Sequence, residues 1–423
     1  MMNEAWTWTW RPLREVTIRG STWNPRTDPR PMIRYVDVSA ISRDELRIIS
    51  TAEYSADNAP SRARKVVKAG DTVLATVRPT LRRIAQIPAS LDGEIVSTAF
   101  CILRPNPSVI HPDFLFFVMQ LERVTDGIAA MQTGASYPAV RDIDVLDQVV
   151  PLPPLPEQRK IAAVLNTIRT ALLHQAKCEV NATALKRAAM RTLFTRGLRG
   201  EAQKETEIGP VPESWKRLPI SALGKIVTGN TPPTNDPANY AAGEVPFIAP
   251  GDIEHGFRIE KTEKFITEQG LKCSRPITKG TTCFVCIGST IGKVGYAMSK
   301  ICATNQQINS VLPNGGFDPL FTFYLLTFWA DHVRKHASRS PVPILSKGAF
   351  EQVEVVATTN LDEQQEIAAI LATIDRKIDL HRRKRAVLEG LFKALLHKLM
   401  VGEIRAGDLD LSALKSTEDL TLN

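Results

Sequence analysis

The chain has 423 residues and no apolar run long enough to cross a membrane. Its longest apolar stretch, Phe114 to Met119, is far shorter than the ~18 residues that a membrane-spanning helix needs. The opening residues, Met1 to Trp6, lack the charged segment and apolar run of a secretory signal. Only six cysteines occur, scattered over both halves, which favours free thiols over a disulfide framework. These absences predict a cytoplasmic protein with no membrane-spanning helix.

Patterns typical of catalytic centres are also lacking. Residues 288–294 resemble a phosphate-binding loop, but the glycines are one residue too close and no Ser or Thr follows Lys293, so we interpret them as a tight turn between strands. Cys283 and Cys286 have the spacing of zinc ligands, but the apolar residues between them favour a strand, in which residues three apart face opposite sides. The chain has neither the Glu-x-Lys tripeptide of restriction-type nucleases nor the Asn/Asp-Pro-Pro-aromatic motif of adenine methyltransferases. We therefore expect no catalytic residue, no metal site and no cofactor in this chain.

What the chain does contain is an internal repeat. The twelve residues from Glu157 to Ile168 return 206 positions later as Glu363 to Ile374, and eight of the twelve are identical. Weaker echoes join residues 69–73 to 279–283 and residues 112–116 to 319–323. A period of half the chain predicts two similar modules in tandem. The echoes keep the apolar framework while the polar residues differ, as expected of two recognition domains with different targets.

Length, charge and local patterns agree with two modules. The length suits two domains of roughly 150 residues with connecting helices. Lys and Arg outnumber Asp and Glu by 53 to 45, and the net charge of +8 favours a polyanionic partner. Apolar runs bounded by turn residues predict strands at 35–38, 73–77, 100–103 and 145–152. The polar stretch 200–210, with Gly and Pro at its ends and no periodicity, predicts a linker.

Each module is followed by a predicted long helix, the first from Glu157 to about Leu198 and the second from Glu363 to about Val401. Apolar residues recur at spacings of three and four along both. Each helix would be ~60 Å long and must bury its single apolar stripe against a partner, for which the other copy is the obvious candidate. The residues expected to pair are Ile161, Leu165, Ile168, Leu172 and Leu185 in the first helix and Ile367, Leu371, Ile374, Ile378, Leu388, Leu391 and Leu395 in the second.

These motifs resemble a known family. Pro151 to Gln158, followed by Ile-Ala-Ala-x-Leu, and their second copy at Asp362 to Leu371 closely resemble the conserved regions of the DNA-specificity subunit (HsdS) of type I restriction-modification systems. Residues 215–232 resemble the opening of that family's target-recognition domain, and residues 291–294 and 305–307 resemble its later strands. The first module resembles the pattern through residues 35–39, 70–71 and 97–98, but it has Val77-Arg78-Pro79-Thr80-Leu81 where the second has Ile287-Gly288-Ser289-Thr290-Ile291.

The resemblance implies an α+β fold of two tandem globular α/β target-recognition domains, separated by two long helices that pair as an antiparallel coiled coil with pseudo-two-fold symmetry. The implied segments are a first target-recognition domain at 1–154, a first spacer helix at 155–199, a linker at 200–214, a second target-recognition domain at 215–360, a second spacer helix at 361–401 and a tail at 402–423. Each domain would read one half of a bipartite site in double-stranded DNA, and the helices would set the spacer. The implied partners are two modification subunits, which carry S-adenosylmethionine and methylate adenine N6, and two restriction subunits, which use ATP and magnesium.

Residues that contact DNA should include Arg and Lys on phosphates and hydrogen-bonding side chains on base edges. In the first domain the candidates belong to three groups, which are a dense basic run, a basic loop and two residues just before the final strand. They are Arg62, Arg64, Lys65 and Lys68 in the run, Arg78, Arg82 and Arg83 in the loop, and Tyr137 and Arg141 before the strand. In the second domain the candidates are Asn230, Thr231, Asn235, Tyr240, Ser289, Lys293, Arg339, Ser340 and Lys347. Arg382 and Arg383 on the second helix could face phosphates, contact a partner or lie on a solvated face.

Two questions stay open at this point. Residues 305–307 could read bases, but structural hydrogen bonds within a strand are favoured there. For the whole chain, the alternatives to a specificity subunit are a stand-alone DNA-modifying enzyme and a coiled-coil scaffold for protein interactions.

Overall fold

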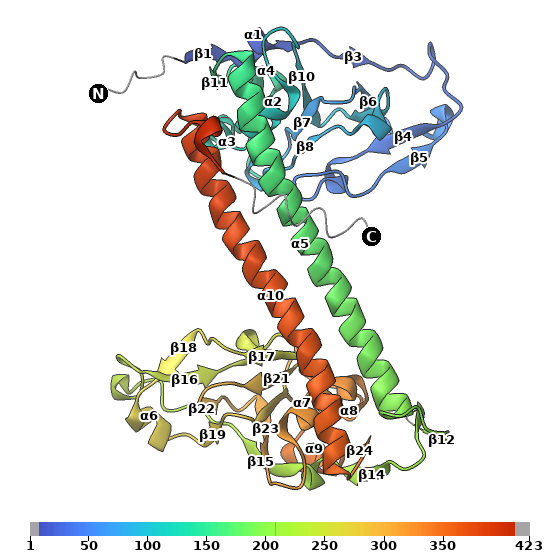
Figure 1. Ribbon diagram of the computed structural model, residues 1–423, viewed down its shortest axis with the longest axis vertical. Coiled ribbons are helices and arrows are strands. Elements are labelled where there is room, and N and C mark those ends of the chain that lie inside the picture. Colours follow the sequence, from blue (N-terminus) through green and yellow to red (C-terminus); the bar gives the residue numbers. More distant parts are fainter. Residues whose placement is uncertain (1–7, 208, 411–423) are drawn as a thin grey trace. The chain divides into compact units, whose positions relative to one another are not determined.

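The computed structural model describes residues 8–207 and 209–410. The chain forms two compact units: the first comprises residues 1–177 and 382–423, and the second comprises residues 178–381. Two long helices, α5 (Leu155–Arg196) and α10 (Leu361–Met400), contribute one part each to both units and are drawn in green and red in Figure 1. No helix in the described ranges is both long and apolar enough to span a membrane.

The first unit contains two small sheets and a strand pair, with strand orders β3-β6-β9-β4-β5, β2-β10-β7-β8 and β1-β11. Strands β4 and β9 run parallel, whereas the other strand pairs described in this unit are antiparallel. The strands are β1 (Thr9–Pro12), β2 (Thr17–Ile18), β3 (Ser21–Thr22), β4 (Ile33–Val36), β5 (Ala52–Tyr54), β6 (Ala63–Val66), β7 (Thr72–Ala75), β8 (Ile84–Gln86), β9 (Ile95–Ser97), β10 (Phe100–Pro105) and β11 (Val149–Leu152). The short helices are α1 (Leu13–Val16), α2 (Pro112–Val118), α3 (Glu122–Ala130) and α4 (Asp142–Leu146).

The second unit has the same plan, with a five-stranded sheet β15-β23-β20-β21-β17, a four-stranded sheet β18-β16-β22-β19 and the pairs β14-β24 and β12-β13. Its strands are β12 (Gln203–Thr206), β13 (Gly209–Pro212), β14 (Lys216–Pro219), β15 (Gly224–Thr228), β16 (Val245–Ile248), β17 (Phe257–Ile259), β18 (Lys264–Ile266), β19 (Pro276–Thr278), β20 (Thr282–Val285), β21 (Val294–Ala297), β22 (Ile301–Thr304), β23 (Ile308–Pro313) and β24 (Glu354–Ala357). Its short helices are α6 (Glu268–Lys272), α7 (Pro319–Phe328), α8 (Ala330–Arg334) and α9 (Lys347–Gln352).

The two units repeat each other in detail, which confirms the prediction of two similar modules. Gly70 and Gly280 each have a positive φ just before the matching strands β7 and β20. A Cβ on either glycine would touch a proline, Pro112 or Pro319, and these prolines begin the matching helices α2 and α7. Glycine therefore occupies both positions because the backbone is left-handed there.

The repeated glutamine, Gln158 and Gln364, ties each long helix to its own unit. The Gln158 side chain is fully buried, accepts a hydrogen bond from the His111 backbone N–H (2.8 Å) and donates to the Pro153 carbonyl (2.8 Å). Gln364 makes the same pair of bonds, from the Asp318 N–H (2.8 Å) and to the Thr358 carbonyl (3.0 Å). Buried backbone groups need such partners, so this part of the repeat serves the fold of each unit.

The long helices pair within each unit. In the first unit, Ile161, Leu165 and Ile168 near the start of α5 share one core with Leu395 and Leu399 near the end of α10. In the second unit the ends are reversed, because the C-terminal part of α5 (Met190, Leu193, Phe194) packs in one core with the N-terminal part of α10 (Ile367, Ala368, Leu371). The helices are therefore antiparallel, and the predicted α+β class with two tandem modules and a paired-helix coiled coil is confirmed.

Two residues expected in the pairing stripe lie outside it. Leu185 is 55% exposed and Leu391 is 38% exposed. Their neighbours Lys186 and Phe392 point inward instead. Because successive residues on a helix are rotated by roughly 100°, the next residue faces a different side. Ile374 is half-buried, whereas Ile378 is fully buried.

The predicted linker contains an antiparallel strand pair, β12–β13, because residues 203–206 pair with residues 209–212. One local expectation was wrong. The run 145–152, expected to be one strand, begins in α4 and only its second half forms β11. Helix α4 starts there because the Asp144 carboxylate accepts the Arg141 backbone N–H, which caps the first turn.

The interpretation of the thiols is confirmed. Cys283 and Cys286 are both buried, but Cys283 packs in the core around Val285 whereas Cys286 packs in the core around Phe284. Residues three apart on a strand thus face opposite sides. Burial raises the pKa of the Cys286 thiol to about 12, which keeps it protonated and unreactive at neutral pH.

Candidate nucleic-acid interface

Four loops of the first unit meet at one place, here called the first loop cluster (residues 61–62, 76–82, 97–99 and 133–140). Backbone hydrogen bonds join them: Thr98 N–H donates to Arg62 O (2.8 Å), and Arg78 N–H donates to Pro138 O (2.7 Å). Thr76 links the remaining loops, since its N–H donates to Ala99 O and its carbonyl accepts from Val140 N–H. These loops are held as one rigid surface.

The second unit has a second loop cluster (residues 228–231, 286–292, 305–307 and 338–345), and its last three loops match loops 76–82, 97–99 and 133–140 of the first cluster. Gly288 N–H donates to Pro343 O (3.0 Å), the counterpart of the bond from Arg78 to Pro138. Cys286 takes the place of Thr76, because its N–H donates to Gln307 O and its carbonyl accepts from Leu345 N–H. The same backbone frame therefore carries different side chains in the two units.

The first loop cluster holds two arginines in an unfavourable backbone conformation. Arg78 and Arg82 have φ values of 51° and 47°, in the left-handed region. The second loop cluster has glycines at the matching positions, Gly288 (96°) and Gly292 (93°). A left-handed backbone costs a residue other than glycine about 1–2 kcal/mol. Glycine would avoid this cost, so the arginine side chains are retained at the expense of the fold.

These arginines are presented outward. The Arg78 guanidinium lies over the ring of Tyr137, 5.5 Å from its centroid, and Tyr137 is 73% exposed. Arg82 pairs with Asp126 at 2.9 Å on the surface. An exposed ring beside a guanidinium offers both a stacking face and a charged hydrogen-bonding fork to a nucleic acid.

The structure divides the predicted basic run 62–68. Arg62 lies exposed in the first loop cluster, whereas Lys68 lies beyond the other end of β6, about 20 Å away along the extended chain. Between them, Lys65 forms an ion pair with Asp142 (2.6 Å) and donates to Phe100 O (2.6 Å), and Arg64 donates to Ala63 O. The run is therefore not one basic patch.

Two other predicted residues are engaged inside the first unit. One Arg83 nitrogen donates to the carbonyls of Val38 and Ile41, which holds the turn after β4 in place. Arg141 forms a bidentate ion pair with Asp144 (2.6 and 3.1 Å), and the hydrogen bonds from its guanidinium lower the pKa of that carboxyl. These contacts indicate supporting roles.

The second loop cluster contains five of the predicted residues: Asn230, Thr231, Ser289, Arg339 and Ser340. Ser289 and Arg339 are exposed there. Asn230 donates to Cys273 O (2.7 Å) and Thr231 donates to Gln306 Oε1 (2.7 Å). The other predicted residues, Asn235, Tyr240, Lys293 and Lys347, lie outside the cluster.

Residues 305–307 make internal hydrogen bonds, as the structural interpretation predicted. Asn305 Nδ2 donates to Gln307 Oε1 (3.0 Å) and Gln307 N–H donates to Asn305 Oδ1 (3.0 Å). They form a turn between β22 and β23, however, and not part of a strand. They support the second loop cluster from within.

Residues 31–182 and 212–390 match the family model described as "Type I restriction modification DNA specificity domain". The chain belongs to this family. It is similar to the type I restriction enzyme MjaIX specificity subunit of Methanocaldococcus jannaschii (29% identical over 203 residues, 47% of this chain and 46% of the relative). It is also similar to the HindI specificity subunit of Haemophilus influenzae (22% over 415 residues, 82% and 89%).

Solved structures share the architecture. One, from work titled "Structural basis underlying complex assembly and conformational transition of the type I R-M system", has a TM-score of 0.55 and 26% identity, and the match covers 94% of this chain and 98% of the other. The S subunit from M. genitalium has a TM-score of 0.63 at 14% identity, covering 95% and 98%, and shows the shared fold. The protein is thus a type I specificity subunit, and DNA recognition is its role.

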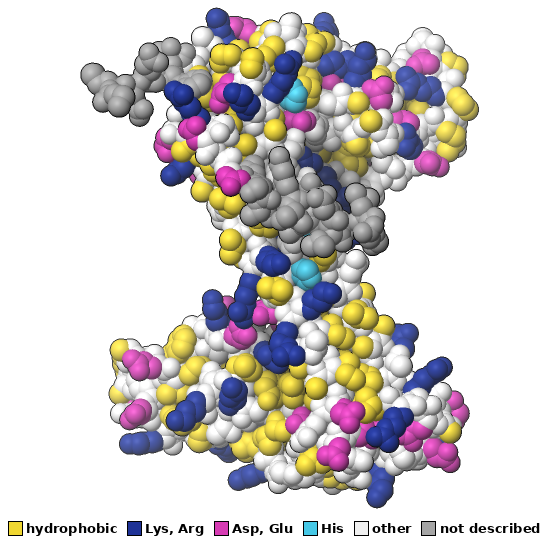
Figure 2. Space-filling model, viewed as in Figure 1, with side chains coloured by type: hydrophobic (Ala, Val, Ile, Leu, Met, Phe, Trp, Pro, Cys, Tyr) yellow, Lys and Arg dark blue, Asp and Glu magenta, His cyan; other side chains and the backbone are white. Residues whose placement is uncertain are grey.

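A specificity subunit needs a surface that the polyanionic DNA can approach. On the face shown in Figure 2, Lys and Arg side chains are spread over both units and interspersed with acidic ones. Arg383 is exposed on α10 and Arg382 is half-buried beside it. No group of three or more His, Cys, Asp or Glu side chains in the ranges 8–207 and 209–410 is placed to hold a metal ion.

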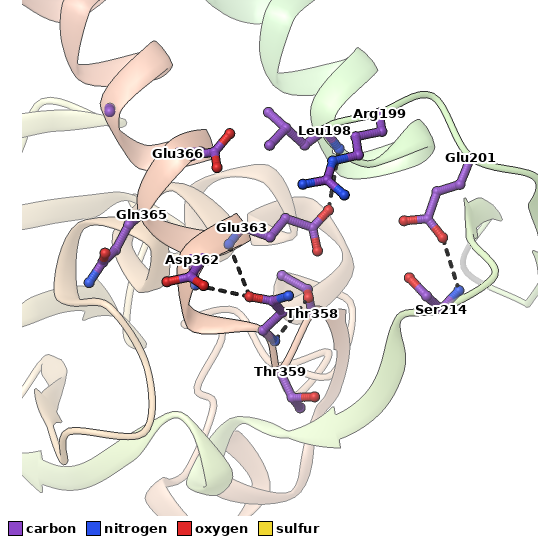
Figure 3. Close-up of a pocket in the computed structure, with 12 residues that line it drawn as sticks. Leu198, Arg199, Glu201, Ser214, Thr358, Thr359, Asp362, Glu363, Gln365 and Glu366 are labelled. Atoms are coloured by element: carbon purple, nitrogen blue, oxygen red, sulfur yellow. Dashed lines mark hydrogen bonds between the residues drawn. The ribbon is translucent and has the colours of Figure 1, made fainter.

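A pocket of about 760 Å³ lies in the second unit where α5 ends and α10 begins (Figure 3). Its wall carries Glu201, Asp362, Glu363 and Glu366 against one cation, Arg199. Glu363 accepts the Leu198 backbone N–H (3.3 Å), which ties the two helix ends together. Phosphates would be repelled by so many carboxylates, so this pocket does not belong to the DNA-facing surface.

Sequence reasoning missed the left-handed arginines, although the repeat held a signal for them. The aligned loops have arginine at 78 and 82 in one copy and glycine at 288 and 292 in the other. Glycine at a turn indicates a positive φ, and the shared frame extends this conformation to the arginines.

Proposed function

We propose that each unit of this specificity subunit reads one half of a bipartite DNA site through its loop cluster. The observation that carries this proposal is that three loops of the two clusters match, because their backbone hydrogen bonds recur while the exposed side chains differ. A shared frame with different side chains is what two half-sites of different sequence require. The predicted DNA contacts in the clusters are Arg62, Arg78, Arg82 and Tyr137 in the first unit and Ser289, Arg339 and Ser340 in the second.

The proposed complex contains two modification subunits and two restriction subunits. The modification subunits would bring S-adenosylmethionine, and the restriction subunits would bring ATP and magnesium. The internal repeat supports this pairing, because two similar units offer two similar docking places. The complex would act in the cytoplasm on double-stranded DNA.

The experiment that tests this function is expression of the chain with its modification subunit, followed by methylome sequencing. We expect methylated adenines in a motif of two defined halves separated by an undefined spacer. Methylation that does not depend on this chain, or a motif with a single half, would contradict the proposal. Purified chain that methylates DNA without a partner would instead support the alternative of a stand-alone enzyme.

The antiparallel helices are proposed to set the spacer. We expect that inserting seven residues after Lys177 in α5 and seven after His381 in α10 changes the spacer but leaves both half-site sequences intact. Seven residues preserve the apolar stripe and lengthen each helix by about 10 Å, the rise of about three base pairs.

Methylome sequencing of cells carrying the doubly extended chain measures the new spacer. The matched control carries the insertion in α5 alone, which breaks the register of pairing and is expected to lose methylation. An unchanged spacer in the doubly extended chain would exclude the helices as the ruler.

A further inference from the structure

A second pocket, of about 480 Å³, opens in the first unit beside the first loop cluster. It lies beyond the carboxyl end of β4, which runs parallel to β9. Its lining includes Tyr35, Asp37, Tyr54 and Arg62. Ligands commonly bind outside the carboxyl ends of parallel strands, because polar groups from neighbouring loops converge there.

The pocket presents one hydrogen-bond acceptor, the Asp37 carboxylate, and one donor, the Arg62 guanidinium, that remain available to a ligand. The Asp37 carboxylate forms no ion pair with any described residue, and its hydrogen bond from Tyr35 Oη is long, at 3.4 Å. The Arg62 guanidinium forms no hydrogen bond or ion pair with any described residue. Both side chains are exposed, and both lie close enough to Tyr35 to influence its hydroxyl electrostatically.

The surrounding structure holds these two groups in position. Arg83 fixes the turn that follows Asp37 by donating to the carbonyls of Val38 and Ile41. The carbonyl of Arg62 accepts the Thr98 backbone N–H, which fixes the other wall. Tyr35 and Tyr54 meet edge to face, with ring centroids 6.1 Å apart, and close the floor.

The matching place in the second unit is lined by different side chains. The residue after β16 that corresponds to Asp37 is Ala249, which offers no side-chain acceptor. Tyr240 and Leu271 pack there against Phe247 and Ile266. The Asp37 carboxylate therefore distinguishes the first unit from the second, as a group that determines specificity should.

From this geometry we propose that Asp37 and Arg62 read one C·G base pair of the first half-site in the major groove, an inference that rests on the proposed function. Arg62 would donate to guanine O6 and N7, and Asp37 would accept the cytosine N4 amino group, both groups lying on the same groove edge. An ionised carboxylate only accepts hydrogen bonds. It therefore pairs with the amino group of cytosine and rejects the O4 acceptor of thymine. The Tyr35 ring is buried and the tyrosines are not parallel, so no slot is available for stacking a displaced base.

The test compares Asp37→Asn and Arg62→Ala with the parent chain, each expressed with the modification subunit. Methylome sequencing and titration with first half-site duplexes should show relaxed discrimination at one C·G pair, by roughly 5- to 150-fold, with the other positions unchanged. Asp37→Asn should accept thymine in place of cytosine, because an amide N–H can donate to O4.

The matched controls are Glu53→Gln, an exposed acid on β5 outside the pocket lining, and Arg26→Ala, an exposed base elsewhere in the unit. Unchanged recognition of the second half-site shows that each variant is folded. A parent motif whose first half contains no C·G pair, or unaltered discrimination in both variants, would overturn the inference while the bipartite function stands. A parent motif without two halves would instead overturn the proposed function.

Discussion

Replacing Lys186 with alanine is expected to lower the free energy of unfolding of the second unit by about 3–5 kcal/mol. Lys186 on α5 is 4% exposed and lies 2.5 Å from the carboxylate of Asp375 on α10, which is 7% exposed. Lys186 also donates to Gly256 O (2.6 Å), and Tyr324 Oη donates to Asp375 (2.6 Å). Removing the lysine would leave a carboxylate buried without its counter-charge.

Burial lowers the pKa of Lys186, and the Asp375 carboxylate acts in the opposite direction. The network joins α5, α10 and the globular part of the second unit. It thereby orients the helix pair, because the charges are satisfied in one register only. Chemical denaturation of the Lys186→Ala chain, followed through the transition of the second unit, measures the loss.

The first unit suggests the matched control. Its residues at the positions of Lys186 and Tyr324 are Phe392 and Phe117, whose rings pack 6.0 Å apart. A triple variant, Lys186→Phe with Asp375→Leu and Tyr324→Phe, removes both charges of the ion pair together and should recover most of the lost stability. A Lys186→Ala chain within about 1 kcal/mol of the parent would show that the ion pair is dispensable.

Replacing Arg78 with glycine is expected to weaken binding of the first half-site by about 1–3 kcal/mol while the fold stays at least as stable. Glycine relieves the left-handed strain of about 1–2 kcal/mol, which outweighs its own entropic cost of about 0.5–1 kcal/mol. The second unit has Gly288 in this conformation, so its frame accepts the change. A substitution that keeps stability but loses affinity separates recognition from folding.

Titration of DNA at several salt concentrations shows what Arg78 contacts. A phosphate contact predicts uniformly weaker binding and a salt slope reduced by about one, whereas a base contact predicts relaxed sequence preference at one position. Arg26→Ala serves as the control for loss of one surface charge. Unchanged affinity and salt slope in Arg78→Gly would remove this loop from the interface.

The sequence alone was sufficient for the architecture. The repeat at residues 157 and 363 established two modules, and apolar spacings of three and four established the long helices. Gly70 and Gly280 marked matching turns, and the alternation around Cys283 predicted a strand with buried thiols. These features depend on residues that are close together in the sequence, because apolar periodicity and turn residues determine local structure.

Only the tertiary structure decided which polar residues remain available to a ligand. Lys65 is engaged by Asp142, 77 positions away, and Arg83 by carbonyls more than 40 positions away, so charge density along the chain overstated the basic surface. The pocket between Asp37 and Arg62 likewise forms from segments that meet because β4 and β6 both pair with β9. Hydrogen bonds and burial depend on distance in space, and for these residues that distance is set by the packing of segments remote in sequence.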